Sequence, residues 1–189
     1  MDSVTLLQRV VDQTGQVVDG IAPEDLSKPT LCTDWTVRDL INHITGGSTM
    51  FAVSAETGDV SDEMIGQLLG GDNLGDDYKG AFKTATARAM AAFDQPGVLE
   101  KVVKLPFGEM PAGIALNIAI FDVATHACDL AKATGQTIKD DELMEQALAI
   151  GTQMIGPEMR TPGMFDQAQP IDTAASASDR LLAFAGRQL

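Results

Sequence analysis

Apolar residues recur every three or four positions through most of the chain, the spacing that places them on one face of an α-helix. This pattern predicts four long helices, a shorter fifth one and then one or two helical turns. The expected ranges are 3–20, 36–56, 76–94, 110–134, 140–155 and 178–184. Such a pattern predicts an all-α fold, most economically a four-helix bundle with additional short helices and loops, formed as one domain by residues 1–189.

Local signals give the expected ends of two of these helices. Thr36 and Asp39 have the spacing of a capping box, in which each residue's side chain bonds the backbone amide of the other, and they predict the start of the second helix. Pro111 is expected in the first turn of the fourth helix, and Gly135 is expected to stop it.

Three segments fall outside the long helices. Residues 58–75 are rich in glycine and aspartate and are expected to form a loop with one helical turn. Residues 98–105 predict a short strand or an extended crossover. Residues 156–169 predict a loop laid over the helices.

Two adjacent glycines interrupt the second expected helix. Gly46 and Gly47 follow His43 by three and four residues, on the same face. Glycine costs a helix about 1 kcal/mol, so the pair indicates either close approach by another backbone or ligand, or a weakened helix.

Composition and charge narrow the classes of function. The formal net charge is −14, which repels nucleic acids and anionic membranes. No leader segment is recognised at the N-terminus, and the apolar run 112–131 carries three ionisable residues, so neither a signal peptide nor a membrane helix is expected. Cys32 and Cys128 are too few for a disulfide framework. We therefore expect a cytoplasmic protein with free thiols that binds neither nucleic acid nor membrane.

Residues 110–134 form the most apolar stretch of the chain, yet they include Asp122, His126 and Asp129. Spacings of four and three place all of them on one stripe of a helix. A buried carboxylate or imidazole needs a partner, because leaving it unpaired costs several kcal/mol. We interpret that partner as a metal ion, held by Asp122 and His126 and by His43 from a facing helix.

Three ligands of N, N and O type, with a fourth position left to water, are typical of catalytic zinc. Nickel, manganese or iron accept the same set. Asp129, or Asp39 one turn before His43, is expected to orient a ligand imidazole by contacting it on the side away from the metal. Asp39 is also claimed by the capping box, so Asp129 is preferred. The alternative is a metal-free core with two hydrogen-bonded histidines; Cys128, which points away from His126, is interpreted as packing.

Two stretches resemble a known family. Residues 35–44, WTVRDLINHI, are similar to the second-helix motif of the DinB-like superfamily, in particular the N-terminal metal-binding domain of mycothiol-dependent maleylpyruvate isomerases. Residues 122–136 are similar to that family's second metal motif. Residues 177–184 also resemble the tail of an actinobacterial subgroup of unassigned members.

The resemblance spans nearly the whole chain and implies a helical bundle with a divalent metal, usually zinc, held by His43, Asp122 and His126. Two departures lie in the motifs. Asp122 stands where the isomerases have glutamate, and Cys128 stands where the subgroup commonly has tryptophan. The separate C-terminal domain of the isomerase also has no recognised counterpart, so its particular substrate is not carried over.

The function implied is that of a metal-dependent enzyme. The thiolate of mycothiol, or of another low-molecular-weight thiol, would attack a small electrophile in a transfer or an isomerisation. The alternative is a non-catalytic module in which a metal or small ligand stabilises the bundle or senses a thiol. Both hypotheses predict small-molecule partners. The sequence is equally compatible with a monomer and a homodimer.

Overall fold

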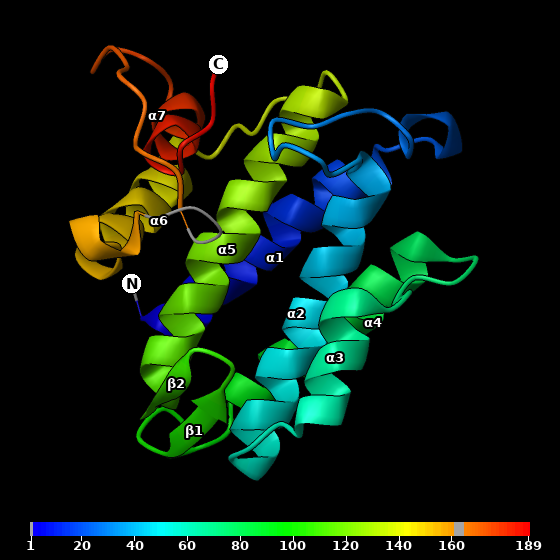
Figure 1. The fold of residues 1–189 in the computed structure, drawn as a ribbon, viewed down its shortest axis with the longest axis vertical. Helices are drawn as coiled ribbons and strands as arrows, with labels where there is room; N and C mark the ends of the chain where they lie inside the picture. The colour runs from blue at the N-terminus through cyan, green and yellow to red at the C-terminus, as the bar shows by residue number, and fades with distance from the viewer. Residues whose placement is uncertain (1, 161–164) are drawn as a thin grey trace.

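The computed structural model describes residues 2–160 and 165–189, and the described part is mostly helical (Figure 1). Its α-helices are α1 (Ser3–Asp19), α2 (Val37–Thr57), α3 (Asp62–Gly70), α4 (Tyr78–Phe93), α5 (Ala112–Ala133), α6 (Asp141–Met154) and α7 (Ala177–Phe184). A hairpin of strands β1 (Val102–Leu105) and β2 (Gly108–Pro111) joins α4 to α5. The prediction of an all-α fold is confirmed, because this strand pair is the only sheet in the described part of the chain.

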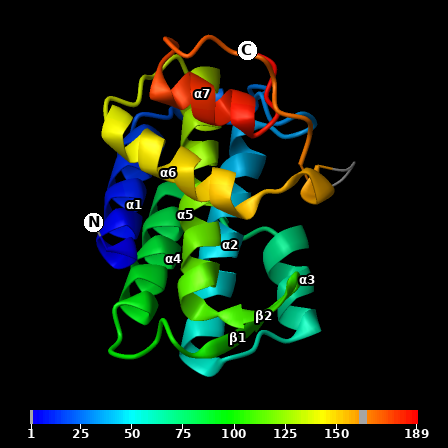
Figure 2. The same ribbon diagram turned by 90° about the vertical axis from the view of Figure 1, so that its left-hand side faces the viewer.

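The four long helices α1, α2, α4 and α5 pack side by side in a ring (Figures 1 and 2). In that ring α1 contacts α4 and α5, and α2 contacts the same two helices from the other side. Helices α6 and α7 lie against the outer face of α5. Helix α5 is long and apolar enough to cross a membrane, but its most apolar window is 78% buried inside the fold, as expected for a central core helix.

The ends of α2 and α5, the helices that carry the predicted metal ligands, follow from local chemistry. The Thr36 hydroxyl accepts the Asp39 amide at 3.3 Å and the Asp39 carboxylate accepts the Thr36 amide at 2.9 Å, so the predicted capping box starts α2. Gly135 adopts a positive φ of 69° directly after Thr134, the residue that caps the end of α5, as predicted for a stop. Pro111 is the residue before α5 rather than part of its first turn, because it still pairs with Val102 in the hairpin.

Two local predictions need correction. Residues 58–75 contain the nine-residue helix α3, where the sequence indicated one turn; the Ser61 hydroxyl caps it by accepting the Met64 amide at 3.3 Å. The extended segment 98–105 provides β1, but β2 was not predicted, since Gly108 and Pro111 are poor strand formers. The predicted loop 156–169 begins with a 3₁₀ turn, Pro157–Met159, and includes residues 161–164, which lie outside the described part.

Helix α3 explains one of the two glycines near His43. A Cβ on Gly46 would collide with the backbone carbonyl of Leu68, so α3 packs backbone to backbone against α2. Nothing lies within 4 Å of the corresponding position on Gly47. The close approach inferred from the sequence is therefore real for Gly46 and is made by another helix.

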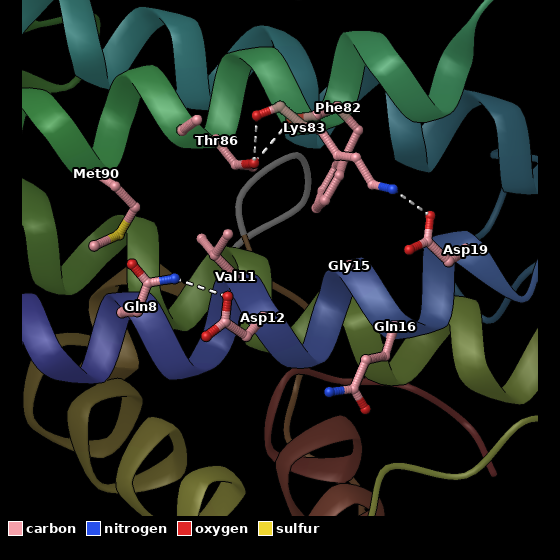
Figure 3. A pocket seen from close by; sticks show the side chains of 11 residues that line it. Gln8, Val11, Asp12, Gly15, Gln16, Asp19, Phe82, Lys83, Thr86 and Met90 are labelled. Carbon is pink, nitrogen blue, oxygen red and sulfur yellow. Dashed lines mark hydrogen bonds and ion pairs between the residues drawn. The ribbon is translucent and has the colours of Figure 1, made fainter.

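A groove of about 680 Å³ runs between α1 and α4 on the surface (Figure 3). Its polar side chains come from two helices: Gln8, Asp12, Gln16 and Asp19 from α1, and Lys83 and Thr86 from α4. It lies on the α1 and α4 side of the ring, and the predicted metal ligands lie on α2 and α5.

Candidate metal centre

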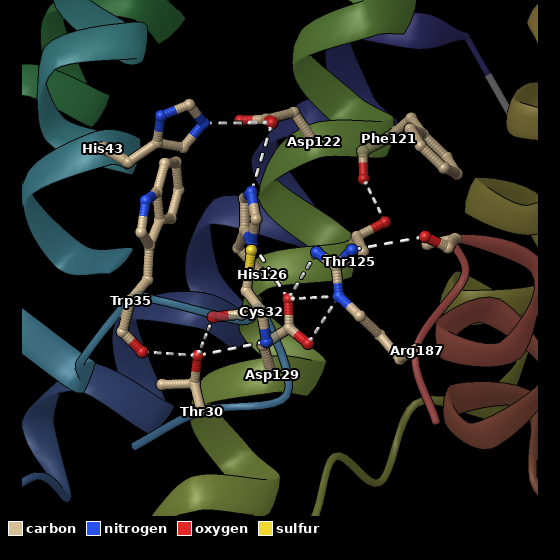
Figure 4. A network of polar contacts seen from close by, with 11 residues as sticks. Thr30, Cys32, Trp35, His43, Phe121, Asp122, Thr125, His126, Asp129 and Arg187 are labelled. Atoms are coloured by element: carbon tan, nitrogen blue, oxygen red, sulfur yellow. Dashed lines mark hydrogen bonds and ion pairs between the residues drawn. The ribbon is translucent and has the colours of Figure 1, made fainter. Parts of the chain in front are cut away.

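Three predicted ligands meet where α2 packs against α5 (Figure 4). His43 projects from the middle of α2, and Asp122 and His126 project from successive turns of α5. The Oδ1 atom of Asp122 lies 3.3 Å from Nε2 of His43 and 3.5 Å from Nε2 of His126. One ligand atom from each residue lies within 4.8 Å of the other two, which is close enough for a single ion to contact all of them.

Burial differs across the cluster. The His126 side chain is 8% exposed, whereas those of His43 and Asp122 are 28% and 29% exposed. The cluster therefore has a closed side at His126 and an open side at the other two residues. An open side is what distinguishes a metal site that admits a further ligand from a fully enclosed structural site.

Asp129 and Arg187 hold His126 on the side of its ring opposite Asp122. The Asp129 carboxylate is fully buried and lies 3.0 Å from Nδ1 of His126. The Arg187 guanidinium donates to both carboxylate oxygens, from Nε at 3.1 Å and from Nη2 at 3.0 Å. A carboxylate bound to a guanidinium can only accept, so Nδ1 must carry the proton of that contact. In a neutral imidazole this leaves the lone pair on Nε2, which faces Asp122.

The electrostatics of the cluster favour positive charge at its centre. Burial acts to raise the pKa of Asp122, but the neighbouring imidazoles of His43 and His126 outweigh it and keep the pKa well below its usual value. Burial acts to lower the pKa of His126, but Asp122 and Asp129 raise it to about 9. The two carboxylates therefore stabilise a cation at this point, whether it is a proton or a metal ion.

Trp35 closes one side of the cluster. Its ring centroid lies 4.7 Å from that of His43 and 5.9 Å from that of His126. The loop before α2 fixes this ring, because Thr30 bonds the Trp35 carbonyl through both its hydroxyl, at 2.9 Å, and its amide, at 3.2 Å. The Trp35 ring is thus held against both ligand imidazoles and limits the directions from which a small molecule reaches them.

A cavity of about 710 Å³ opens on the exposed side of the cluster. Apart from His43, Asp122, His126, Thr125 and Arg187, its described lining consists of apolar side chains. They come from the hairpin, α5, the end of α6 and the segments that follow it: Phe107, Met110, Ile114, Ile118, Phe121, Met154, Ile155, Met159, Phe165 and Ala185. This volume lies within the roughly 300–1,000 Å³ typical of small-molecule sites.

Cys32 lies beside the cluster, with its sulfur close to ligand atoms of His126 and Asp129. Asp129 is already bonded to Arg187 and His126, so this second grouping has less free ligand capacity than the first. Burial raises the pKa of the Cys32 thiol, which keeps it protonated near neutral pH. Cys128 packs in the core with its sulfur 3.4 Å from that of Met144, and burial raises its pKa to about 12.

The structure brings together the three predicted ligands and Asp129, but it places Asp39 elsewhere. The Asp39 carboxylate is exposed and bonds the Thr36 amide and hydroxyl at the start of α2. Sequence reasoning did not identify Arg187, because its separation of 58 positions from Asp129 leaves no local pattern. The packing of Trp35 was also not foreseen, although Trp35 belongs to the motif around His43.

Comparisons with known proteins find relatives of this chain. The chain matches the family model of the mycothiol maleylpyruvate isomerase N-terminal domain over residues 7–131, which contain the whole candidate ligand set. Two uncharacterized proteins of Mycobacterium tuberculosis, from strains CDC 1551 / Oshkosh and ATCC 25618 / H37Rv, are each 34% identical over 189 residues. Each match covers 99% of this chain and 98% of the relative.

Two solved structures share the fold. A crystal structure of a mycothiol-dependent maleylpyruvate isomerase matches with a TM-score of 0.64 at 19% identity, over 78% of this chain and 66% of the isomerase chain. A histidine-to-alanine mutant of such an isomerase matches with the same TM-score at 18% identity. At this identity the likeness establishes a common fold, and about a third of the isomerase lies outside it.

Proposed function

Because the chain belongs to the mycothiol maleylpyruvate isomerase N-terminal domain family, we propose that it is a divalent-metal enzyme that uses a low-molecular-weight thiol on a small electrophile. One observation carries the proposal. His43, Asp122 and His126 converge on one point, and that point lies at the wall of a cavity large enough for a small molecule. A module in which the metal only stabilises the bundle would need the converging ligands but not the cavity.

The donor set fits a divalent cation. Two imidazole nitrogens and one carboxylate oxygen suit zinc, and they also suit nickel, manganese or iron. The charges fit as well, since Asp122 and Asp129 carry two negative charges against the one positive charge of Arg187. A bound dication would lower the pKa of a coordinated thiol and so supply a thiolate near neutral pH.

The protein's own residues supply position and environment. Asp129 and Arg187 fix the ring of His126, Trp35 packs against both imidazoles, and the apolar cavity walls exclude water from the electrophile. In a transfer by addition, the thiol sulfur bonds to an electrophilic carbon and the thiol proton ends on the adjacent carbon. In an isomerisation the same carbon–sulfur bond later breaks and the thiol is regenerated. Mycothiol is the expected thiol, and the reduced cytoplasm is the expected compartment.

The metal is tested on untagged protein by elemental analysis and by calorimetric titration of the chelator-treated protein with Zn²⁺. We expect near-stoichiometric metal in the wild type and very little in His126→Ala. Asp76→Asn removes an exposed loop carboxylate and serves as the matched control, with wild-type metal content expected. Equal, near-zero metal in all three proteins would overturn the proposal.

Catalysis is tested by incubating the metal-loaded protein with several thiols, mycothiol included, and a panel of electrophiles. We expect turnover that requires both metal and thiol and that is lost in His126→Ala. Metal binding without turnover across the panel would favour the non-catalytic module instead.

A further inference from the structure

The cavity beside His43, Asp122 and His126 is lined by apolar side chains up to the edge of this cluster. Its walls come from four parts of the chain: Phe107 and Met110 in the hairpin, Ile114 and Ile118 on α5, Met154 at the end of α6, and Phe165. The α5 wall is continuous with the cluster, because Ile114, Ile118 and Asp122 follow one another at intervals of four residues on one stripe. A molecule that reaches the metal therefore lies along apolar side chains.

The mouth of the cavity is apolar too. Phe107 and Ile114 are 51% and 46% exposed, although both are large hydrophobic residues. They face the same opening from the hairpin and from the first turns of α5. Exposed apolar residues gathered at the rim of a pocket are typical of a site that recognises apolar ligands.

The described lining offers no free cation to a carboxylate. Arg187 is the one arginine or lysine among the described lining residues, and its guanidinium is bonded to both oxygens of Asp129 and to the Ala185 carbonyl at 3.2 Å. The nearby Arg160 bonds the Asp166 carbonyl at 2.7 Å and stacks over the ring of Phe184, 4.6 Å from its centroid. Both guanidinium groups are thus committed within the protein.

We propose that the second substrate is a neutral, apolar electrophile rather than a dicarboxylate. This inference rests on the proposed function of the cluster and names the substrate class of that site. With a dication and the proposed thiolate bound, the charges of Asp122, Asp129 and Arg187 leave no net positive charge at the site. The carboxylates of a dianion would therefore be desolvated against apolar walls without a partner. Maleylpyruvate, which names the solved relative, carries two carboxylates and is excluded by this argument.

The test measures binding to the zinc-loaded protein without any thiol. The neutral fluorophore N-phenyl-1-naphthylamine reports occupation of the cavity, and diethyl maleate and maleate compete with it as a matched pair that differs only in charge and ester groups. We expect diethyl maleate to displace the fluorophore at a concentration about tenfold lower or more, because the dianion loses hydration that nothing in the cavity replaces. Equal displacement, or stronger displacement by maleate, would overturn the proposal.

A charge placed on the cavity wall locates the binding site. Ile118→Lys is expected to weaken fluorophore binding about tenfold or more and to strengthen maleate binding, since it adds the missing cation. Val102→Lys, on a hairpin residue that is 63% exposed and outside the cavity lining, should leave both unchanged. Ile114→Lys, at the exposed rim, replaces Ile118→Lys if that variant fails to fold. Wild-type fluorophore affinity in the folded wall variant would contradict the proposal.

These outcomes separate the two proposals. A preference for the neutral ester without thiol-dependent turnover would keep the substrate class of the cavity and reject the enzyme. Turnover that favours dicarboxylates over neutral esters would keep the enzyme and reject the apolar substrate.

Discussion

Two of the hollows in this fold are nearly equal in size, and they differ in what their polar side chains do. The groove between α1 and α4 measures about 680 Å³ and the cavity beside the histidines about 710 Å³. In the groove, Gln8 bonds Asp12 at 2.7 Å and Lys83 pairs with Asp19 at 2.9 Å. These four side chains are thus paired with near neighbours on the surface (Figure 3).

In the cavity, by contrast, three ionisable side chains turn toward one point. Asp122 lies between two imidazoles, and behind them a buried carboxylate is balanced by Arg187 (Figure 4). Placing these groups together away from water costs free energy that local pairing on a surface does not. The comparison shows that convergence of partly buried ligands, rather than volume, marks the functional candidate.

The largest expected effect tests this convergence directly. Asp122→Asn should lower zinc affinity by about 100-fold or more, because even outer-shell changes cost 10–100-fold. Asp19→Asn, the matched change in the groove, should leave zinc affinity unchanged. Calorimetric titration of chelator-treated protein measures both. Comparable zinc affinity in the two variants would show that the converging ligands of the cavity do not bind zinc, and that the cavity does not differ from the groove in this respect.

Arg187 gives the next largest effect, on stability. Arg187→Ala leaves the buried Asp129 carboxylate without its cation and should cost about 3 kcal/mol of unfolding free energy in the metal-free protein. Lys83→Ala breaks the exposed pair with Asp19 and should cost less than about 1 kcal/mol. Urea unfolding followed by circular dichroism measures both. A small loss for Arg187→Ala would mean that Asp129 is stabilised by His126 alone.

A pair of glycine substitutions gives the smallest effects, of opposite sign. A Cβ on Gly151 in α6 would meet the rings of Phe121 and Phe184 behind the cavity, so Gly151→Ala should destabilise by about 1–3 kcal/mol. A Cβ on Gly15 in the groove meets only Phe82, at 3.9 Å, so Gly15→Ala should stabilise α1 by about 0.5–1 kcal/mol. Thermal unfolding of both variants decides the signs, and destabilisation by Gly15→Ala would show that the groove is more tightly packed than described.

Much of this arrangement could be predicted from the sequence, because its causes are local. Helical periodicity and caps depend on residues three or four apart, which is why the capping box of Thr36 and the stop at Gly135 were predicted correctly. The same rule explains the meeting of Asp122 with His126, one turn apart on α5. Pairing with His43 required only that the two apolar helix faces pack together.

The features that could not be predicted from the sequence depend on contacts between distant segments of the chain. Arg187 reaches Asp129 across 58 residues, and β2 exists because Gly108 and Pro111 can pair with β1 despite their weak strand propensity. Asp39 shows a competition between two local roles. The cap at Thr36 holds its carboxylate at an exposed helix end, whereas His126 receives its support from Asp129.

The position of Trp35 has an optical consequence. It is the only tryptophan in the chain, and its ring lies 4.7 Å from that of His43. Excitation at the red edge of protein absorbance therefore excites only the Trp35 ring, which lies against the candidate ligands. The emission spectrum of the unlabelled protein becomes a built-in gauge of this one place in the fold, readable in any of its variants that keep the ring.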